Sequence, residues 1–454
     1  MLFNSLDFLV FFPVVTLFYF LLPHRLRWLL LLVASCIFYM YFIPVYLLIL
    51  VFTIIVDYIA GIAIENAAGV KRKIFLIISL VANIGVLIIF KYAGWLHPAW
   101  KVILPLGLSF HTFQAMSYTI EVYRGRQAAE RHPGIYALYV MFYPQLVAGP
   151  IERPSHLLPQ LSARHSFNWG NLAAGLRLML WGFFKKLVIA DRLSGYVNYV
   201  YDHAGQLSYG YVIVAVVFFS FQVYCDFSGY SDIATGAAKT MGFDLMVNFN
   251  RPYFSTNIRE FWSRWHISLT SWFRDYVYIP LGGNRAGKYR KYFNILAVFL
   301  LSGLWHGAGW NFLIWGGLHA MLMIGWVWRR DRRPEGDAGP GFLGRMGGIA
   351  LTFCLVTLAW VFFRCTDLGQ ALQVLGSMLG QQGDPYFNMQ ITRWTIGLGF
   401  IFIILLLLME RFTSPRLEEW RGRFWPDIAF GALTLTAILL FGVFSGQSFI
   451  YFQF

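Results

Sequence analysis

The sequence predicts an all-α protein that crosses a membrane many times, and three observations support this prediction. Hydrophobic residues make up 58% of the 454 residues, charged residues only 13%, and the mean hydropathy is +0.57. A soluble domain carries about 25% charged residues, so the composition indicates a protein embedded in lipid. The apolar residues form long runs suited to helices and not the alternating pattern of a membrane barrel.

A spanning helix needs about 20 mainly apolar residues. The segments that approach this length cover residues 7–22, 27–44, 46–63, 74–92, 102–122, 134–148, 172–194, 210–225, 291–304, 308–328, 347–364, 395–410 and 428–444. Several of them are short or interrupted by polar residues. We therefore expect about 11 complete crossings, together with helices that re-enter the membrane or lie at its surface.

Charged loops orient the first third of the chain, because basic residues concentrate in the cytoplasmic loops of membrane proteins. The basic loops follow the first, third and fifth predicted spans, so they should share one face, which we expect to be cytoplasmic. These loops are His24–Arg27, Lys71–Lys73 and Arg124–His132. Such clustering in loops accounts for the net charge of +14. We therefore do not expect the protein to bind nucleic acid.

The first apolar run, at residues 8–22, has no basic segment before it and no small-residue cleavage site after it. We therefore expect it to be a retained first span and not a cleaved signal peptide. The further candidates for the cytoplasmic face are Lys185, Lys186 and the segments Arg285–Lys291 and Arg329–Arg333.

The segment Asp226–Tyr292 is the longest break in hydrophobicity, and it mixes aromatic with basic residues. This mixture is typical of amphipathic helices that lie at an interface or line a polar cavity. Within it, Gly282–Tyr289 comes within one residue of a P-loop, but Tyr289 stands where a serine or threonine would hold magnesium. A basic turn is the better interpretation of that stretch.

Motifs for metal or serine chemistry are missing. The cysteines are Cys36, Cys225, Cys354 and Cys365, with no CxxC spacing, so neither a disulfide framework nor a zinc site is predicted. HExxH and GxSxG motifs are also absent. We expect no metal and no bound cofactor.

Three histidines lie within or beside strongly apolar segments: His266, His306 and His319. An ionisable side chain at membrane depth is costly and is by default a functional-site hypothesis. The alternative for each is a structural histidine that is hydrogen-bonded to a backbone carbonyl inside a helix bundle. Gly316 and Gly317 precede His319 by about one helical turn and would let a backbone or a ligand approach closely.

A neutral imidazole suits proton abstraction from an attacking hydroxyl, so His319 is the candidate general base. His266 could orient the donor or polarise its carbonyl, and a supporting role is favoured for His306. Polar residues inside other spans suggest a water-accessible cavity, although helix–helix hydrogen bonds could account for some of them. The further candidates for supporting the site or lining this cavity are Trp265, Asn311, Trp315, Asp226 and Ser231.

Several stretches resemble the membrane-bound O-acyltransferase family, in the bacterial branch that acetylates extracellular polysaccharides. The similarity covers most of residues 104–320, and FIYFQF at Phe449–Phe454 adds to it. The matching stretches are LPLGLSFHTFQAMSYTIEVYRG, YPQLVAGPIERP, GFFKKLVIADRL, YCDFSGYSDIATGAAKTMGF, REFWSRWHISLTSWFRDYVYIPLGGNR and GLWHGAGWNFLIWGGLH.

The resemblance implies roles for individual residues. The family's characteristic histidine, in a WGxxHG context, falls on His319, with Ala320 where glycine is usual. Its second active-site histidine, in an RWHxSL context, falls on His266. A central tunnel through the bilayer is implied, with one acyltransferase domain over residues 1–454: N-terminal helices (1–103), a core (104–320) and C-terminal helices (321–454).

The resemblance also implies substrates and a location. The donor would be acetyl-CoA from the cytoplasm. From their own charge, Arg285, Lys288 and Arg290 are the candidates for contacting its phosphates. The acceptor would be an exopolysaccharide such as alginate, or an exported acetylesterase-like protein that passes the group on. The chain would be a multi-pass protein of the bacterial inner membrane.

Other functions remain open from the sequence. Broken helices with intramembrane polar residues are also typical of transporters, although no internal repeat is visible. A scaffold for an exopolysaccharide complex is a third possibility. Within the family, the polymer could instead be cellulose, peptidoglycan or teichoic acid.

Overall fold

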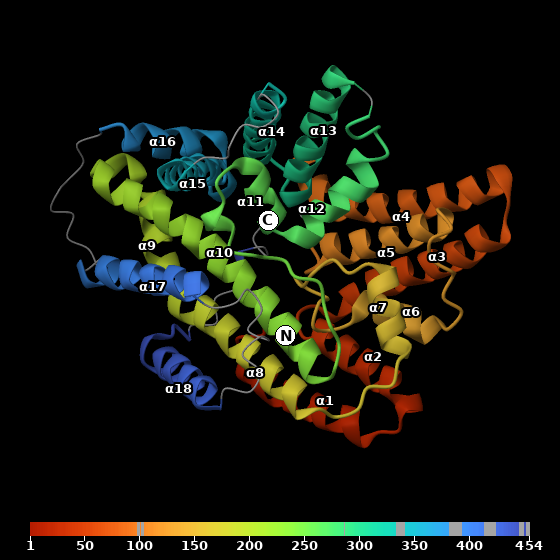
Figure 1. The fold of residues 1–454 in the computed structure, drawn as a ribbon. Coiled ribbons are helices and arrows are strands. Elements are labelled where there is room, and N and C mark those ends of the chain that lie inside the picture. The colour runs from red at the N-terminus through yellow and green to blue at the C-terminus, as the bar shows by residue number, and fades with distance from the viewer. Residues whose placement is uncertain are drawn as a thin grey trace.

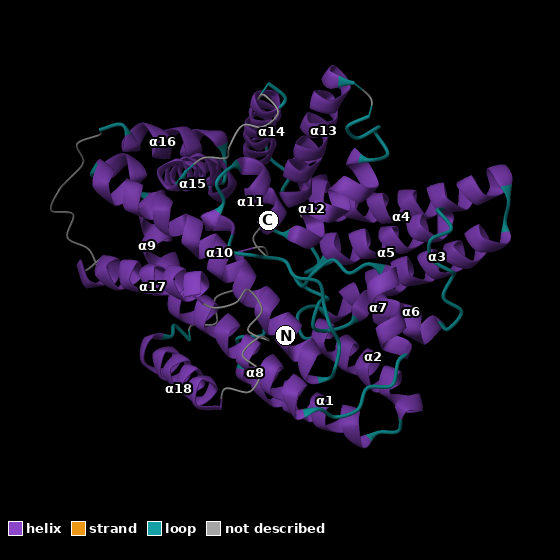
Figure 2. Cartoon of the chain, in the orientation of Figure 1, coloured by secondary structure: helices purple, strands orange, loops and turns teal. Residues whose placement is uncertain are grey.

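The computed structural model describes residues 1–97, 100, 104–285, 287–332, 341–380, 393–412, 424–444 and 449–450. This part of the chain folds into helices joined by loops and contains no strand (Figure 2). The all-α prediction is therefore confirmed. Residues 102–103 of the span predicted at 102–122 and the last four residues of FIYFQF lie outside the described ranges.

The helices follow one another as Figure 1 shows. They are α1 (Leu6–Leu21), α2 (His24–Met40), η1 (Pro44–Tyr46), α3 (Leu47–Asn66), α4 (Gly69–Leu96), α5 (Leu108–Tyr123), α6 (Pro133–Met141), α7 (Pro154–Ser162), α8 (Trp169–Phe183), η2 (Phe184–Ala190), α9 (Asp191–Asp202), η3 (Ala204–Gln206), α10 (Tyr209–Thr240), η4 (Pro252–Phe254), α11 (Ile258–Arg264), α12 (Ile267–Phe273), η5 (Arg274–Tyr278), α13 (Lys288–His306), α14 (Trp310–Arg330), α15 (Phe342–Arg364), α16 (Leu368–Met378), α17 (Arg393–Phe412) and α18 (Phe424–Phe441).

Six helical segments among the described residues are long and apolar enough to cross a membrane. They are Pro44–Asn66, Gly69–Trp95, Tyr209–Thr240, Trp310–Arg330, Phe342–Arg364 and Trp394–Arg411. The shorter helix α1 and the segment Ile428–Phe441 of α18 are also apolar. The chain is thus a membrane protein with several apolar helices, while the count of about 11 crossings stays a prediction.

Two elements differ from their predicted ranges. The span expected at 134–148 is only the short helix α6, because Pro144 follows and cannot donate the backbone hydrogen bond that a longer helix needs. The span predicted at 210–225 is too short, because α10 continues to Thr240 through the first part of the segment Asp226–Tyr292. Its polar residues stay helical because other helices bury them; Asp226, for example, pairs with Lys186 of η2.

Helices α8 and α10 lie side by side at the centre of the molecule and meet through glycines (Figure 1). A Cβ atom added to Gly175 would lie 2.6 Å from the carbonyl oxygen of Gly236. A Cβ atom on Gly182 would lie 2.6 Å from the carbonyl oxygen of Gly229. Both distances are far below van der Waals contact, so these positions need glycine. Small residues at helix contacts are the usual way to pack helices closely in lipid.

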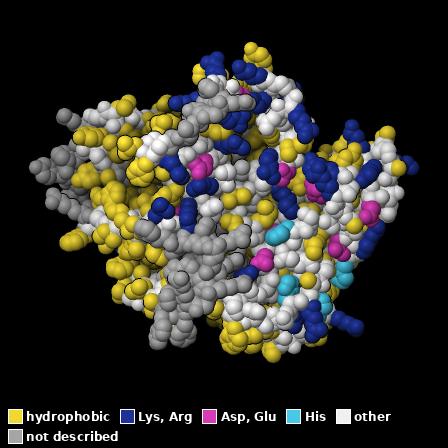
Figure 3. All heavy atoms as spheres, in the orientation of Figure 1, with side chains coloured by type: hydrophobic (Ala, Val, Ile, Leu, Met, Phe, Trp, Pro, Cys, Tyr) yellow, Lys and Arg dark blue, Asp and Glu magenta, His cyan; other side chains and the backbone are white. Residues whose placement is uncertain are grey.

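The basic loops near the N-terminus share one face, as predicted. Arg72 of α4 donates hydrogen bonds to the carbonyl oxygens of Val122 (3.1 Å) and Tyr123 (2.8 Å) at the end of α5. The ring of Trp28 in α2 contacts the ring of His132, with 4.7 Å between centroids. The first turns of α2 and α4 and the loop after α5 therefore lie together. Lys and Arg side chains also outnumber Asp and Glu on the face that Figure 3 presents.

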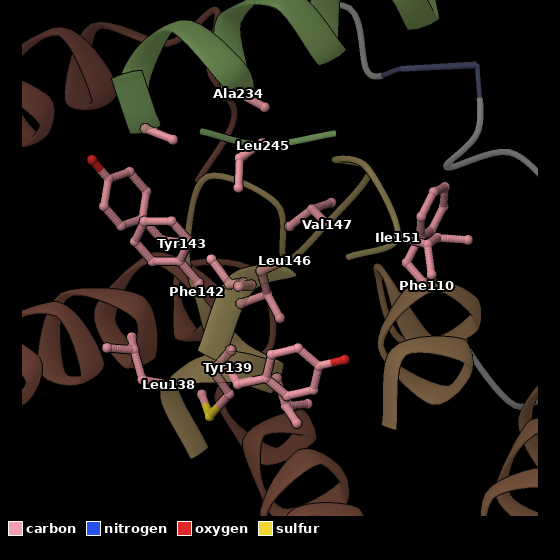
Figure 4. Packing of buried hydrophobic residues seen from close by; sticks show 14 of the residues in the cluster. Phe110, Leu138, Tyr139, Phe142, Tyr143, Leu146, Val147, Ile151, Ala234 and Leu245 are labelled. Carbon is pink, nitrogen blue, oxygen red and sulfur yellow. The ribbon is translucent and has the colours of Figure 1, made fainter. Parts of the chain in front are cut away.

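The segment after α6, which carries YPQLVAGPIERP, passes through the hydrophobic core. Its side chains pack between α10 and the N-terminal helices, as Figure 4 shows for Phe142, Tyr143 and Leu146. Gly107 starts α5 with φ +74° and lies directly against this segment, since an added Cβ atom would be 2.5 Å from the carbonyl oxygen of Leu146. The buried segment thereby fixes where α5 begins.

We predict that Gly182→Ala lowers the free energy of unfolding by about 1–3 kcal/mol, the usual cost of overpacking. The new methyl group would clash with the backbone of α10. Gly195→Ala is the matched control, because an added Cβ atom there meets nothing within 4 Å. Thermal unfolding in detergent measures the effect, and equal midpoints for the two variants would show that α8 and α10 tolerate a wider separation.

Candidate active site

Helices α13 and α14 form a tight antiparallel pair that carries two of the predicted histidines. A Cβ atom on Gly303 would lie 2.3 Å from the carbonyl oxygen of Phe312, and one on Gly316 would lie 2.3 Å from that of Phe299. His306 follows Gly303, and His319 follows Gly316, by about one helical turn. The expected close approach at Gly316 is confirmed, whereas an added Cβ atom on Gly317 meets nothing within 4 Å.

His319 is completely buried among aromatic rings. Its ring centroid lies 4.9 Å from that of Trp262 and 5.0 Å from that of Trp315. Neither ring nitrogen has a hydrogen-bond partner in the described part of the chain. The structural alternative required a hydrogen bond to a backbone carbonyl, and the described residues provide none. A buried polar group without a hydrogen-bond partner lowers the stability of the fold. A catalytic role is one explanation for such a group, and here it would apply to the His319 imidazole.

His266 holds a strained backbone conformation at the start of α12. Its φ is +43° and its ψ is +54°, the left-handed region that residues other than glycine rarely occupy. Such strain costs on the order of 1–3 kcal/mol and persists only where neighbouring groups impose it. The side chain is buried, with its ring centroid 4.6 Å from that of Phe227 and 5.9 Å from that of Trp305.

Asn248 is the residue that fixes this turn. Its carbonyl oxygen accepts a hydrogen bond from the backbone N–H of Ile267 (2.9 Å), and its Oδ1 accepts one from the Ser268 hydroxyl (2.6 Å). Its Nδ2 donates to Ser231 Oγ (3.1 Å). Sequence reasoning missed Asn248, since an asparagine in a loop carries no signal of its own. It did select Ser231, which supports His266 through Asn248.

Two tryptophans connect the three histidines in a continuous series of ring contacts. The Trp305 ring contacts both His266 and His306, with centroid distances of 5.9 and 4.8 Å. The Trp315 ring contacts both His306 and His319, with 5.0 Å in each case. The structure thus brings the predicted histidines into one aromatic cluster, with His306 between the other two.

The remaining predicted residues have separate places. Trp265 is buried against Trp360, with 4.9 Å between ring centroids. Asn311 donates from Nδ2 to the carbonyl oxygen of Cys365 (2.6 Å), which joins the start of α14 to the end of α15. Asp226 accepts hydrogen bonds from Lys186 Nζ (2.6 Å) and from the backbone N–H of Ile450 (2.8 Å). One carboxylate oxygen of Asp226 therefore forms an ion pair with Lys186, and the other binds the backbone of Ile450.

A cavity of about 460 Å³ lies between α11, α12, α13 and α14. Trp262 and Phe299 line this cavity and also contact the ring of His319, so they separate the histidine from it by a single layer of side chains. The basic residues that line it are Arg259, Arg274 and Arg330. Arg285, Lys288 and Arg290, which the sequence suggested for phosphate binding, are not among its lining residues.

Trp326 stands between two of these arginines. The guanidinium carbon of Arg259 lies 5.3 Å from its ring centroid, and that of Arg330 lies 5.1 Å away. Arg330 and Arg274 each pair with the aspartate that follows them in sequence, Asp331 and Asp275. Such exposed pairs are weak, so these guanidinium groups can exchange their partner for an anionic ligand. Among the described residues, no group of three or more His, Cys, Asp or Glu side chains is placed to hold a metal ion.

These features together describe a membrane-embedded protein with three histidines in a buried aromatic cluster beside an arginine-lined cavity. Comparison with known proteins gives the family. Residues 107–366 match the sequence model of the membrane-bound O-acyltransferase family, and the chain belongs to this family. It is accordingly an O-acyltransferase, and the resemblance seen in the sequence is confirmed.

The relatives have different substrates in their names. The chain is 36% identical over 430 residues to the peptidoglycan O-acetyltransferase of Helicobacter pylori, covering 84% of this chain and 80% of that protein. It is 38% identical over 399 residues to the probable alginate O-acetylase of Pseudomonas aeruginosa, covering 83% and 75%. A teichoic acid D-alanyltransferase of Bacillus subtilis is 29% identical over 244 residues, covering 50% and 60%.

We predict that Asn248→Ala slows acyl transfer about tenfold while the apparent KM for the donor changes little. Without the side chain, the Ser268 hydroxyl loses its acceptor and the turn at His266 relaxes, at a cost of about 1–3 kcal/mol. Asn171→Ala is the matched control, because Asn171 lies in α8 away from this network. An unchanged turnover rate in Asn248→Ala with the same unfolding midpoint would contradict a positioning role.

A buried carboxylate anchors the loop that leads to Asn248. Glu152 accepts hydrogen bonds from the backbone N–H of Met246 (2.5 Å) and from His156, whose Nδ1 lies 2.7 Å from Glu152 Oε2. Burial raises the pKa of Glu152, while the hydrogen bond to Glu152 raises the pKa of His156. The protonated imidazole is therefore favoured in the folded protein.

We predict that this pair makes the stability depend on pH. A raised histidine pKa contributes stability below its unfolded value of about 6.5, and the contribution is lost as the pH rises through the folded pKa. As the pH rises above about 6.5, the unfolding midpoint should fall more steeply in the wild type than in His156→Gln. Parallel pH profiles for the two proteins would disprove the coupling.

Proposed function

We propose that this protein transfers the acetyl group of acetyl-CoA to a hydroxyl group, for O-acetylation of an exported polysaccharide such as alginate. One observation carries the proposal: the buried, unpartnered imidazole of His319 lies one aromatic layer from an arginine-lined cavity. The two relatives with acetylase names, at 36% and 38% identity, support acetyl as the group that is moved.

The cavity between α11 and α14 is the proposed donor site. Acetyl-CoA carries several phosphate groups, and arginine binds phosphate through paired, charge-assisted hydrogen bonds. Arg259, Arg274 and Arg330 would hold these phosphates, and Trp326 offers a ring surface between two of the arginines. Beside Arg330, the ion pair of Lys291 and Asp331 joins the start of α13 to the end of α14 and marks the side of the protein on which this cavity lies. By the positive-inside rule, we assign this face to the cytoplasm.

In the proposed reaction, His319 takes the proton from the acceptor hydroxyl as its oxygen attacks the acetyl carbonyl carbon. The carbon–sulfur bond then breaks, and the coenzyme A thiolate leaves and takes up a proton. His266 orients the donor or donates a hydrogen bond to the oxygen that becomes negatively charged. In a variant of this mechanism, His319 itself accepts the acetyl group from the donor and then passes it to the hydroxyl group, so that a covalent intermediate forms.

The acceptor hydroxyl would belong to the polysaccharide itself or to an exported acetylesterase-like partner. No GxSxG nucleophile motif is present in this chain, which is compatible with a nucleophile on a partner. We place the protein in the bacterial inner membrane, with about 11 crossings. Peptidoglycan, cellulose and teichoic acid are the other acceptors to compare, since relatives are named for peptidoglycan and teichoic acid.

The first experiment uses purified protein in nanodiscs with radiolabelled acetyl-CoA and measures thioester consumption and transfer of label. His319→Ala should lower the rate by at least about 10²-fold, the usual contribution of general-base catalysis. His266→Ala should also lower it, and His97→Ala is the control because His97 ends α4 outside the cluster. If His319→Ala keeps the wild-type rate and the wild-type acetyl content of the exported polymer, the proposal is wrong.

A second prediction compares the two sets of basic residues. Arg259→Gln with Arg330→Gln should raise the apparent KM for acetyl-CoA about tenfold or more, while kcat changes less. The reason is that each lost contact with a phosphate group weakens binding by up to about 3 kcal/mol. Arg285→Gln with Arg290→Gln should leave KM unchanged, because these residues do not line the cavity. If KM rises in Arg285→Gln with Arg290→Gln and not in Arg259→Gln with Arg330→Gln, the phosphate groups bind at the start of α13.

A further inference from the structure

A second cavity, of about 1100 Å³, lies outside the arrangement described above. It is larger than the roughly 300–1,000 Å³ of ordinary small-molecule pockets. Its walls come from α10, α11, α15 and α17 together with the η4 segment. None of the three histidines of the aromatic cluster lines it, so the proposed reaction does not use it.

This cavity is polar at one end and apolar at the other. On α15 the lining residues run from Phe342 to Phe353 and include Arg345, and on α17 they run from Phe400 to Arg411. The polar end carries Arg251 and Arg264, whose Nη1 donates a hydrogen bond to the carbonyl oxygen of Arg251 (3.4 Å). Phe221, Phe353 and Ile403 line the apolar part. The lining face of α17 covers about 16 Å at 1.5 Å per residue, which is about half of the hydrocarbon thickness of a bilayer.

The charge of the polar end is strongly positive. Arg251, Arg264, Arg345 and Arg411 line the cavity, and Glu260 is the one acidic residue among its described lining residues. Glu260 already pairs with Arg264, Oε1 to Nη2, at 2.5 Å. Arg345 and Arg411 are both exposed, so their side chains can move to meet a ligand. The excess positive charge calls for an anionic partner.

From this geometry we propose that the cavity binds an anionic phospholipid of the cytoplasmic leaflet. The phosphate group lies among the arginines, and an acyl chain lies in the trough between α10, α15 and α17, against Phe221, Phe353 and Ile403. Basic pockets between membrane helices on the cytoplasmic side are typical sites for anionic lipid headgroups. The length of the trough matches one leaflet, which a free anion would not need.

The lipid site and the donor cavity lie on opposite sides of α11. Arg259, Trp262 and Ser263 line the donor cavity, whereas Glu260 and Arg264 line the lipid cavity. His266 follows this short helix directly, and the backbone carbonyl of Arg264 accepts from Asn250 N at 2.9 Å. A bound lipid would therefore stabilise the helix that enters the strained turn at His266.

The test is native mass spectrometry of the purified full chain, titrated with phosphatidylglycerol and with phosphatidylcholine. The wild type should retain phosphatidylglycerol at least about tenfold better than phosphatidylcholine. Arg345→Gln with Arg411→Gln should abolish most of this preference, because each basic residue near an anionic lipid contributes about fivefold. Both residues are exposed, so the variant should fold.

Arg126→Gln with Arg285→Gln is the matched control, since both residues are exposed and neither lines the cavity. Ile403→Trp, which fills the trough, should weaken retention of phosphatidylglycerol while all four arginines remain. The proposal fails if Arg345→Gln with Arg411→Gln keeps the preference for phosphatidylglycerol. It also fails if glycerol phosphate displaces the bound lipid as well as phosphatidylglycerol does. A mass spectrum in which the wild type is a dimer and the arginine double variant a monomer would instead assign the cavity to contact with a second copy of the chain.

Discussion

The close contact between α13 and α14 is the constraint on which the candidate active site depends. Gly303 and Gly316 let the two backbones approach until carbonyl oxygens occupy the space where side chains would be. Because a histidine follows each glycine by about one turn, the same contact that joins the helices also places His306 and His319 on either side of Trp315. In lipid, helices gain little from hydrophobic burial against each other, so such close packing provides much of their association.

The sequence predicted helices well because long apolar runs leave few alternatives in a bilayer. Most of the predicted spans coincide with helices, and the shared face of the basic loops followed from their parity alone. The extent of α10 beyond Asp226 could not be predicted, since its polar residues are satisfied by partners distant in sequence, such as Lys186. Hydropathy cannot distinguish a polar residue in a loop from one that faces another helix.

The same limitation affected the candidate site. The three histidines stood out because ionisable residues are rare in apolar segments, and they do lie in one cluster. Asn248 gave no such signal, because its importance comes from bonding to the backbone of Ile267 and to the Ser268 hydroxyl. Phosphate binding by Arg285, Lys288 and Arg290, which were chosen for charge density, stays a prediction. The arginines that line the cavity of about 460 Å³ are spread over α11, η5 and α14.

The length of α10 has a consequence for how the protein responds to its membrane. A helix of 32 residues is about 48 Å long, well beyond the roughly 30 Å of hydrocarbon in a bilayer. Yet 83% of its most apolar stretch is buried inside the protein, against 39% for the segment with α3 and 17% for the segment with α4. A change in bilayer thickness therefore acts first on these outer helices, by tilt or local thinning of lipid. Helix α10 supports η2 and the turn at His266. Because its neighbours bury it, a change in bilayer thickness affects it less than it affects α3 and α4.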